Sequence, residues 1–111
     1  MEENPCGNCA EGAWGGANFE ATELGTDSSF GDVTLYRCRQ CRRLWLHYHY
    51  ENEAFTGSGR WYHGPIPREM EGAINVENAL ETLGKLGWYW CGGSYFDGAV
   101  SKSRGLPHLF P

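Results

Sequence analysis

The chain has 111 residues, 16 glycines and a formal net charge of −5, which suits one domain with a modest hydrophobic core. No apolar run is long enough to cross a bilayer, and the first residues lack the apolar core and basic flank of a secretion signal. These features argue against a membrane protein. We therefore expect a cytoplasmic protein, in which cysteines stay reduced.

Two Cys-x-x-Cys pairs, Cys6 with Cys9 and Cys38 with Cys41, provide the clearest chemical signal. Each pair forms a tight turn that directs two sulfurs to one point, and zinc binds four thiolates as a tetrahedron. The sequence therefore predicts one structural zinc ion bound by these four residues, with disulfides as the alternative. The fifth cysteine, Cys91, lies in an apolar run and is expected to pack as a small hydrophobic residue.

Over residues 6–41 the two pairs resemble zinc knuckles and the broad zinc-ribbon class. The resemblance implies a metal-stabilised hairpin. Knuckles commonly have glycine directly after the second cysteine, where this chain has Ala10 and Arg42. The separation of the pairs is also similar to that in rubredoxins, which hold one iron ion in four thiolates, so iron is a second and less favoured expectation.

The segment between the pairs predicts a loop followed by strands. Residues 14–32 are rich in glycine, serine and acidic residues, which favours a long irregular loop with one short strand near 18–23. Residues 33–37 and 44–50 have strand patterns on either side of the second pair, and together they predict a hairpin. Residues 60–63 resume an extended pattern before a Gly-Pro turn.

One amphipathic helix is predicted over residues 75–86, with Asn75 as its N-cap. Residues 88–91 and 94–96 suggest a final hairpin or bulged strand, and residues 99–111 a peripheral tail. The expected fold is α+β: a zinc ribbon (1–45) continues into an antiparallel sheet with the helix on one face (46–98). All 111 residues are expected to form a single domain.

Charge is distributed unevenly along the chain. Residues 1–36 contain acidic residues but no lysine or arginine, whereas the second cysteine pair is surrounded by Arg37, Arg39, Arg42 and Arg43. These arginines could pair with the acidic first third, bind an acidic protein, or bind nucleic acid, and the net negative charge disfavours the last. Arg60, Trp61 and Tyr62 form a second candidate surface, because such residues dominate interface hot spots.

The sequence offers little support for catalysis. It contains no Gly-x-Ser-x-Gly, His-Glu-x-x-His or phosphate-loop motif. His47, His49 and Glu51 would share a strand face and could form a second metal site, although packing explains them as well. We therefore expect a non-catalytic protein.

The sequence thus predicts a small zinc-binding protein that binds another protein through two surfaces. One is the basic turn, formed by the four arginines around the second cysteine pair, and the other is the aromatic surface of residues 60–62. The alternatives are a nucleic-acid-binding zinc ribbon and a rubredoxin-like iron electron carrier.

Overall fold

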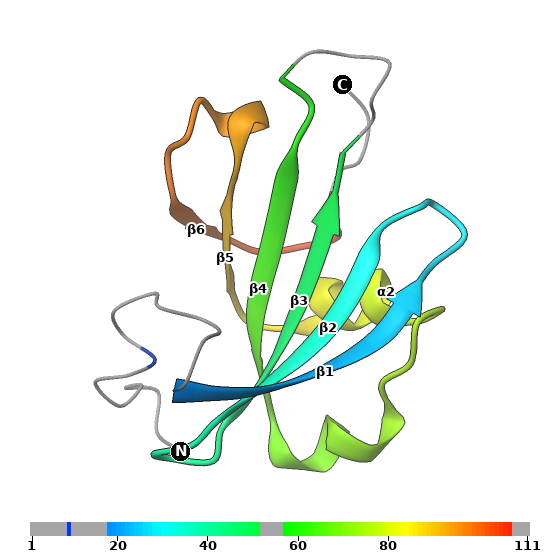
Figure 1. Ribbon diagram of the computed structural model, residues 1–111, viewed down its shortest axis with the longest axis vertical. Coiled ribbons are helices and arrows are strands. Elements are labelled where there is room, and N and C mark those ends of the chain that lie inside the picture. Colours follow the sequence, from blue (N-terminus) through cyan, green and yellow to red (C-terminus); the bar gives the residue numbers. More distant parts are fainter. Residues whose placement is uncertain (1–8, 10–17, 52–56, 108–111) are drawn as a thin grey trace.

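The computed structural model describes Cys9, residues 18–51 and residues 57–107. Six antiparallel strands follow one another in chain order across a single sheet (Figure 1). The strands are β1 (Phe19–Thr26), β2 (Asp32–Cys38), β3 (Leu44–Tyr50), β4 (Arg60–Ile66), β5 (Tyr89–Gly92) and β6 (Ser101–Ser103). An antiparallel sheet with a helix on it agrees with the α+β class expected from the sequence.

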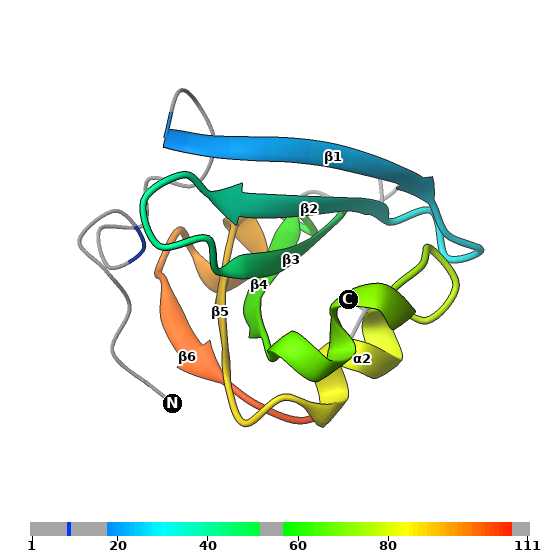
Figure 2. The same cartoon turned by 90° about the horizontal axis from the view of Figure 1, so that it is seen from below.

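Two helical segments connect β4 to β5. The 3₁₀ helix η2 (Arg68–Ala73) comes first, followed by the α-helix α2 (Ala79–Lys85). Both lie on the same side of the sheet (Figure 2). A second 3₁₀ helix, η3 (Ser94–Phe96), connects β5 to β6.

The face of the sheet under α2 carries the larger hydrophobic core, which we call the helix-side core. Its buried residues are Val33, Leu44, Leu46, Tyr48, Tyr62, Ile66, Ala79, Leu83, Leu86, Tyr89 and Cys91. Cys91 therefore packs in a core, as expected. A Cβ atom added at Gly64 would come within 2.5 Å of the Leu86 side chain, so glycine here lets the helical segment pack closely on β4.

The helix is shorter than the sequence pattern predicts, and it begins after Asn78 rather than after Asn75. The Asn75 side chain accepts a hydrogen bond from the Asn78 backbone N–H, and the Asn78 side chain accepts one from the Asn75 N–H. This reciprocal pair satisfies backbone donors in a turn and competes with helix formation over residues 75–78. The structure agrees with the predicted apolar spacing, but the predicted start of the helix is wrong.

The short strand expected near residues 18–23 is present as β1, but it is longer and takes up much of the predicted loop 14–32. The predicted tail 99–111 contains the unexpected strand β6, which pairs with β5. Conversely, residues 94–96 form η3 instead of a strand. Isolated β propensity is weak in β1 and β6, and their pairing with neighbouring strands decides their structure.

Candidate metal centre

Three cysteines from separate parts of the chain converge at one end of the sheet. Cys38 is the last residue of β2, Cys41 lies in the β2–β3 turn, and Cys9 comes from the amino-terminal part. Their sulfur atoms all lie within 4.8 Å of one another. Cys9 and Cys38 are fully buried and Cys41 is exposed. Among the described residues, this is the one group of three or more potential ligands close enough to hold a metal ion.

The sulfur separation fits a tetrahedral metal ion. The Sγ atoms of Cys9 and Cys41 are 3.8 Å apart. Four sulfurs placed about 2.3 Å from a central zinc ion lie about 3.8 Å from one another. A disulfide needs a separation of about 2.05 Å, so the Cys9 and Cys41 sulfurs are not bonded to each other. The described sulfurs therefore fit a metal ion and not a disulfide.

The turn between β2 and β3 presents two of these sulfurs. The Cys38 N–H donates to the Arg43 carbonyl, and the Arg42 N–H donates to the Cys38 carbonyl. Arg42 adopts a φ of 67°, in the left-handed region that glycine tolerates best. This is the position where knuckles commonly have glycine, so the turn keeps the backbone conformation of that motif with an arginine in it.

Cys9 is held in place by the sheet. The Trp45 indole N–H donates a hydrogen bond of 3.3 Å to the Cys9 sulfur. A second buried cluster, which we call the sulfur-side core, contains Cys9, Phe19, Cys38 and Trp45, with Tyr36, Trp88 and Trp90 packed against it. Trp45 alternates with Leu44 and Leu46 along β3, so this core lies on the opposite face of the sheet from α2.

Cys6, the fourth expected ligand, lies outside the described residues. A metal ion bound here would supply a fixed cross-link between Cys9 and the β2–β3 turn. A site made of thiolates suits zinc and iron.

A pair of histidines lies beside the sulfur-side core. His47 of β3 and His63 of β4 are directly opposite each other, and their Nδ1 atoms are 2.9 Å apart. The His63 ring stacks on Trp45 with ring centroids 4.9 Å apart, and the His47 ring stacks on Trp61 at 5.8 Å. A hydrogen bond at this distance requires one ring to donate and the other to accept.

Burial keeps these two imidazoles neutral. Desolvation, followed by the charge of His49, lowers the pKa of His47 to about 4. Desolvation, followed by repulsion from His47 when it is protonated, lowers the pKa of His63 well below its ordinary value. The expected trio of His47, His49 and Glu51 does not gather as a metal site, because His47 turns to the neighbouring strand. The sequence does not single out His63, because its position opposite His47 depends on the register of β3 and β4. The one local signal is that Trp61 and His63 alternate along β4 and so share a face of the sheet.

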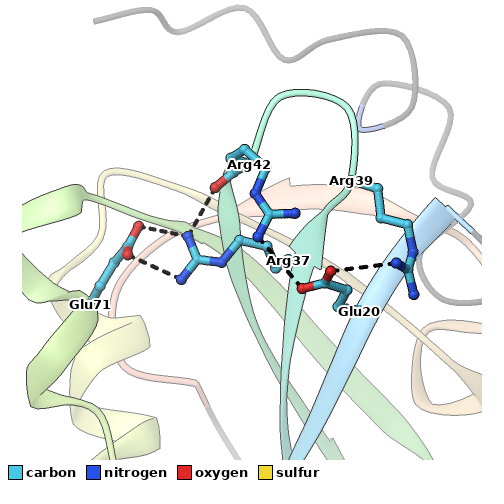
Figure 3. Close-up of polar contacts among 5 residues, drawn as sticks. All are labelled: Glu20, Arg37, Arg39, Arg42 and Glu71. Atoms are coloured by element: carbon cyan, nitrogen blue, oxygen red, sulfur yellow. Dashed lines mark hydrogen bonds and ion pairs between the residues drawn. The ribbon is translucent and has the colours of Figure 1, made fainter.

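The arginines of the basic turn form ion pairs within the protein (Figure 3). Arg37 donates to both carboxylate oxygens of Glu71, at 3.3 and 3.2 Å. Arg39 and Arg42 share Glu20, at 3.4 and 3.6 Å. Arg37 also donates to the Arg42 carbonyl at 2.9 Å, so three hydrogen bonds hold it, while the two contacts to Glu20 are longer and solvent-exposed.

The second candidate surface is largely internal. Arg60 and Tyr62 are buried, at 0% and 3% exposure, and Trp61 is half-buried. The Arg60 guanidinium lies 3.6 Å from the ring centroid of Tyr95, and its Nε–H donates to the Ser58 carbonyl. Arg43 is half-buried. Of the residues expected to meet a partner, Arg39 and Arg42 are the ones with exposed side chains.

Comparison of the chain with protein-family models, with curated proteins and with solved structures gave no match. Within the described residues, no helix is long and apolar enough to span a membrane.

Proposed function

We propose that this is a small, non-catalytic protein in which one zinc ion has a structural role and the β2–β3 turn binds another protein. The observation that carries the zinc site is the convergence of three sulfurs, with Cys9 and Cys41 at the separation that a tetrahedral ion requires. Cys6 would complete the tetrahedron.

Burial supports a structural role for the metal. Cys9 and Cys38 are fully enclosed, and both belong to the sulfur-side core. A catalytic zinc ion keeps a coordination position open for water or substrate, whereas four thiolates close the site. The bound ion would then fix Cys9 against the end of the sheet.

The partner would have an acidic surface. Arg39 and Arg42 have 54% and 57% of their side-chain surface exposed, and both face a single carboxylate, that of Glu20. Exposed ion pairs at such distances contribute little stability, so the two guanidinium groups can exchange this contact for carboxylates of a partner. Arg37 is expected to stay with Glu71, because its two hydrogen bonds fix the geometry of the pair.

Metal analysis of protein purified without a histidine tag tests the zinc assignment. One zinc ion per chain and no visible colour is the expected result. Cys38→Ser should lower the zinc content, and Cys91→Ser, which alters a core thiol outside the cluster, should not. Stoichiometric iron with visible charge-transfer absorption would replace the zinc proposal with an electron carrier.

Charge reversal of the turn tests the partner proposal. Proteins captured from cell extract by the wild type would be identified and purified, and their affinities measured directly. The double variant Arg39→Glu/Arg42→Glu should weaken such binding at least tenfold. Arg104→Glu makes a matched control, since Arg104 is exposed beyond β6. If the wild type, the double variant and the control bind the partner equally well, the β2–β3 turn is not the binding surface.

A further inference from the structure

The three described sulfurs differ sharply in their access to solvent. Cys41 is exposed, whereas Cys9 and Cys38 are completely buried. Of these three cysteines, an oxidant that diffuses in solution therefore reaches Cys41 first. The asymmetry is built into the turn, because Cys38 is the last residue of β2 while Cys41 lies at the exposed part of the loop.

The turn that carries Cys41 is basic. Arg39 and Arg42 flank Cys41 in the sequence, and both side chains are exposed on the same turn. Among the described residues, one carboxylate, that of Glu20, contacts both guanidinium groups. The thiolate is the form of cysteine that peroxides oxidise, and a sulfur that binds zinc is a thiolate.

A second thiol is positioned to complete the reaction. The Cys9 sulfur lies 3.8 Å from the Cys41 sulfur, and the Trp45 indole N–H holds it there. An oxidised Cys41 would therefore have a neighbouring thiol within reach, as redox-sensing cysteines require. Forming a disulfide needs the two sulfurs to approach to about 2.05 Å, a movement of less than about 2 Å.

We propose that the cysteine cluster is a peroxide-sensitive switch, in which Cys41 is the oxidised residue and Cys9 the resolving one. The Cys41 thiolate attacks a hydroperoxide oxygen; the S–O bond forms, the O–O bond breaks, and the departing alkoxide or hydroxide takes a proton from water. The Cys9 thiolate then attacks the Cys41 sulfur; the S–S bond forms and hydroxide leaves. The peroxide is reduced by two electrons and the two thiolates are oxidised by two.

A zinc ion bound here would lose two of its ligands to the disulfide and would be released. The disulfide would keep Cys9 next to the β2–β3 turn, so a covalent bond would replace the metal-mediated cross-link. This inference deepens the proposed zinc site and rests on it. It assigns regulation to the site: zinc release in response to hydrogen peroxide.

The test begins with zinc-loaded full-length protein whose metal content has been measured. Hydrogen peroxide is added, released zinc is followed with a chromogenic chelator, and disulfides are mapped by peptide mass spectrometry. We expect one zinc ion released for each Cys9–Cys41 disulfide formed. Cys91→Ser should release zinc at the wild-type rate, because Cys91 is buried in the helix-side core.

The outcomes separate this inference from the proposed function. Protein that lacks bound metal before peroxide is added would defeat the proposed zinc site itself. Zinc that is bound but retained after peroxide treatment would overturn the switch and leave the zinc site standing. The same holds if release accompanies a disulfide to Cys6 or Cys38, or irreversible sulfinic acid at Cys41, in place of the Cys9–Cys41 bond.

Discussion

The face of the sheet covered by α2 and the opposite face are both buried, but by different means. The helix-side core is mainly aliphatic and tyrosine side chains, and Ala79 and Leu83 of α2 are fully buried in it. The sulfur-side core is smaller and combines cysteines with large aromatic rings. One face is covered by a segment of regular structure, whereas the other includes a cysteine that a metal ion would hold.

This difference indicates what each half of the fold needs. Apolar burial alone can stabilise the helix-side core, since each fully buried aliphatic side chain contributes about 1.5–3 kcal/mol. The sulfur-side core is the kind of small core that proteins of this size often reinforce with a metal. We therefore expect the two faces to respond differently to the same perturbations.

Metal removal should separate the two faces most strongly. We expect a chelator to lower the free energy of unfolding by on the order of 5 kcal/mol, less than the ~10–16 kcal/mol seen in zinc-finger peptides, because the helix-side core does not need the ion. Trp45 should become exposed and its fluorescence emission should shift to the red, while the helical circular dichroism of α2 persists. An unchanged melting temperature after complete metal removal would contradict the structural role.

Truncation in the helix-side core should affect the whole domain. Leu83→Ala removes a fully buried side chain from α2 and should lower the free energy of unfolding by about 3 kcal/mol, measured by urea denaturation. Glu81→Ala, an exposed change on the same helix, should alter it by less than about 0.5 kcal/mol. Zinc content of the folded Leu83→Ala protein should match that of the wild type. Loss of zinc in that variant would mean that the two cores are not separable.

The sequence predicted the parts of this comparison that depend on local patterns. Residue order predicts the hairpin of β2 and β3 and the amphipathic spacing around Ala79 and Leu83. It also predicts that Cys9, Cys38 and Cys41 come together in one cluster. Periodicity and cysteine spacing are short-range signals, so they can be read without knowing the fold.

The parts that were missed depend on pairing between segments. The β3–β4 register brings His47 to His63, and Arg60 enters the interior beside Tyr95 although arginine is rarely buried. Arg37 pairs with Glu71, which is distant in sequence. One expectation was that the arginines would pair with acidic residues in the first third of the chain. A one-residue change in the β3–β4 register would move one strand's side chains to the other face, which would separate His47 from His63. Glu71 and Tyr95 lie in η2 and η3, and their contacts depend on how these segments pack on the sheet. Local patterns therefore say little about these contacts.

Acidification should weaken the sulfur-side face through the histidine pair. The pKa of His47 is about 4 in the folded protein and about 6.5 in an unfolded chain. The unfolded chain therefore binds the proton first, and stability falls as the pH drops from 6.5 to about 4, by about 3 kcal/mol for this group. The pKa of His63 is also lowered in the folded protein, so its protonation reduces stability over acidic pH in the same direction. Well above pH 6.5 both imidazoles are neutral in the folded and the unfolded chain, so they do not make stability depend on pH.

Urea denaturation at several pH values would measure this loss. His47→Phe should make the decline shallower, because the ring is retained between Tyr36 and Trp61 without a titrating nitrogen. His49→Gln alters an exposed residue on the same strand and should leave most of the decline. Zinc content must be measured at each pH, since protonation of thiolates also releases metal. Identical slopes in His47→Phe and the wild type would rule out this origin.

The smallest expected effect concerns the turn that presents the sulfurs. Arg42 holds a φ of 67°, which costs an L-residue about 1–2 kcal/mol relative to glycine. Arg42→Gly should therefore raise the free energy of unfolding of the zinc-bound protein by about 1 kcal/mol, because the lost contact to Glu20 is exposed and weak. Arg39→Gly removes an arginine that contacts the same carboxylate, but Arg39 is not among the positive-φ residues, so this change should lower stability instead. Opposite signs for the two substitutions would show that backbone strain, and not lost charge, dominates at the turn; a loss of stability in both would show the reverse.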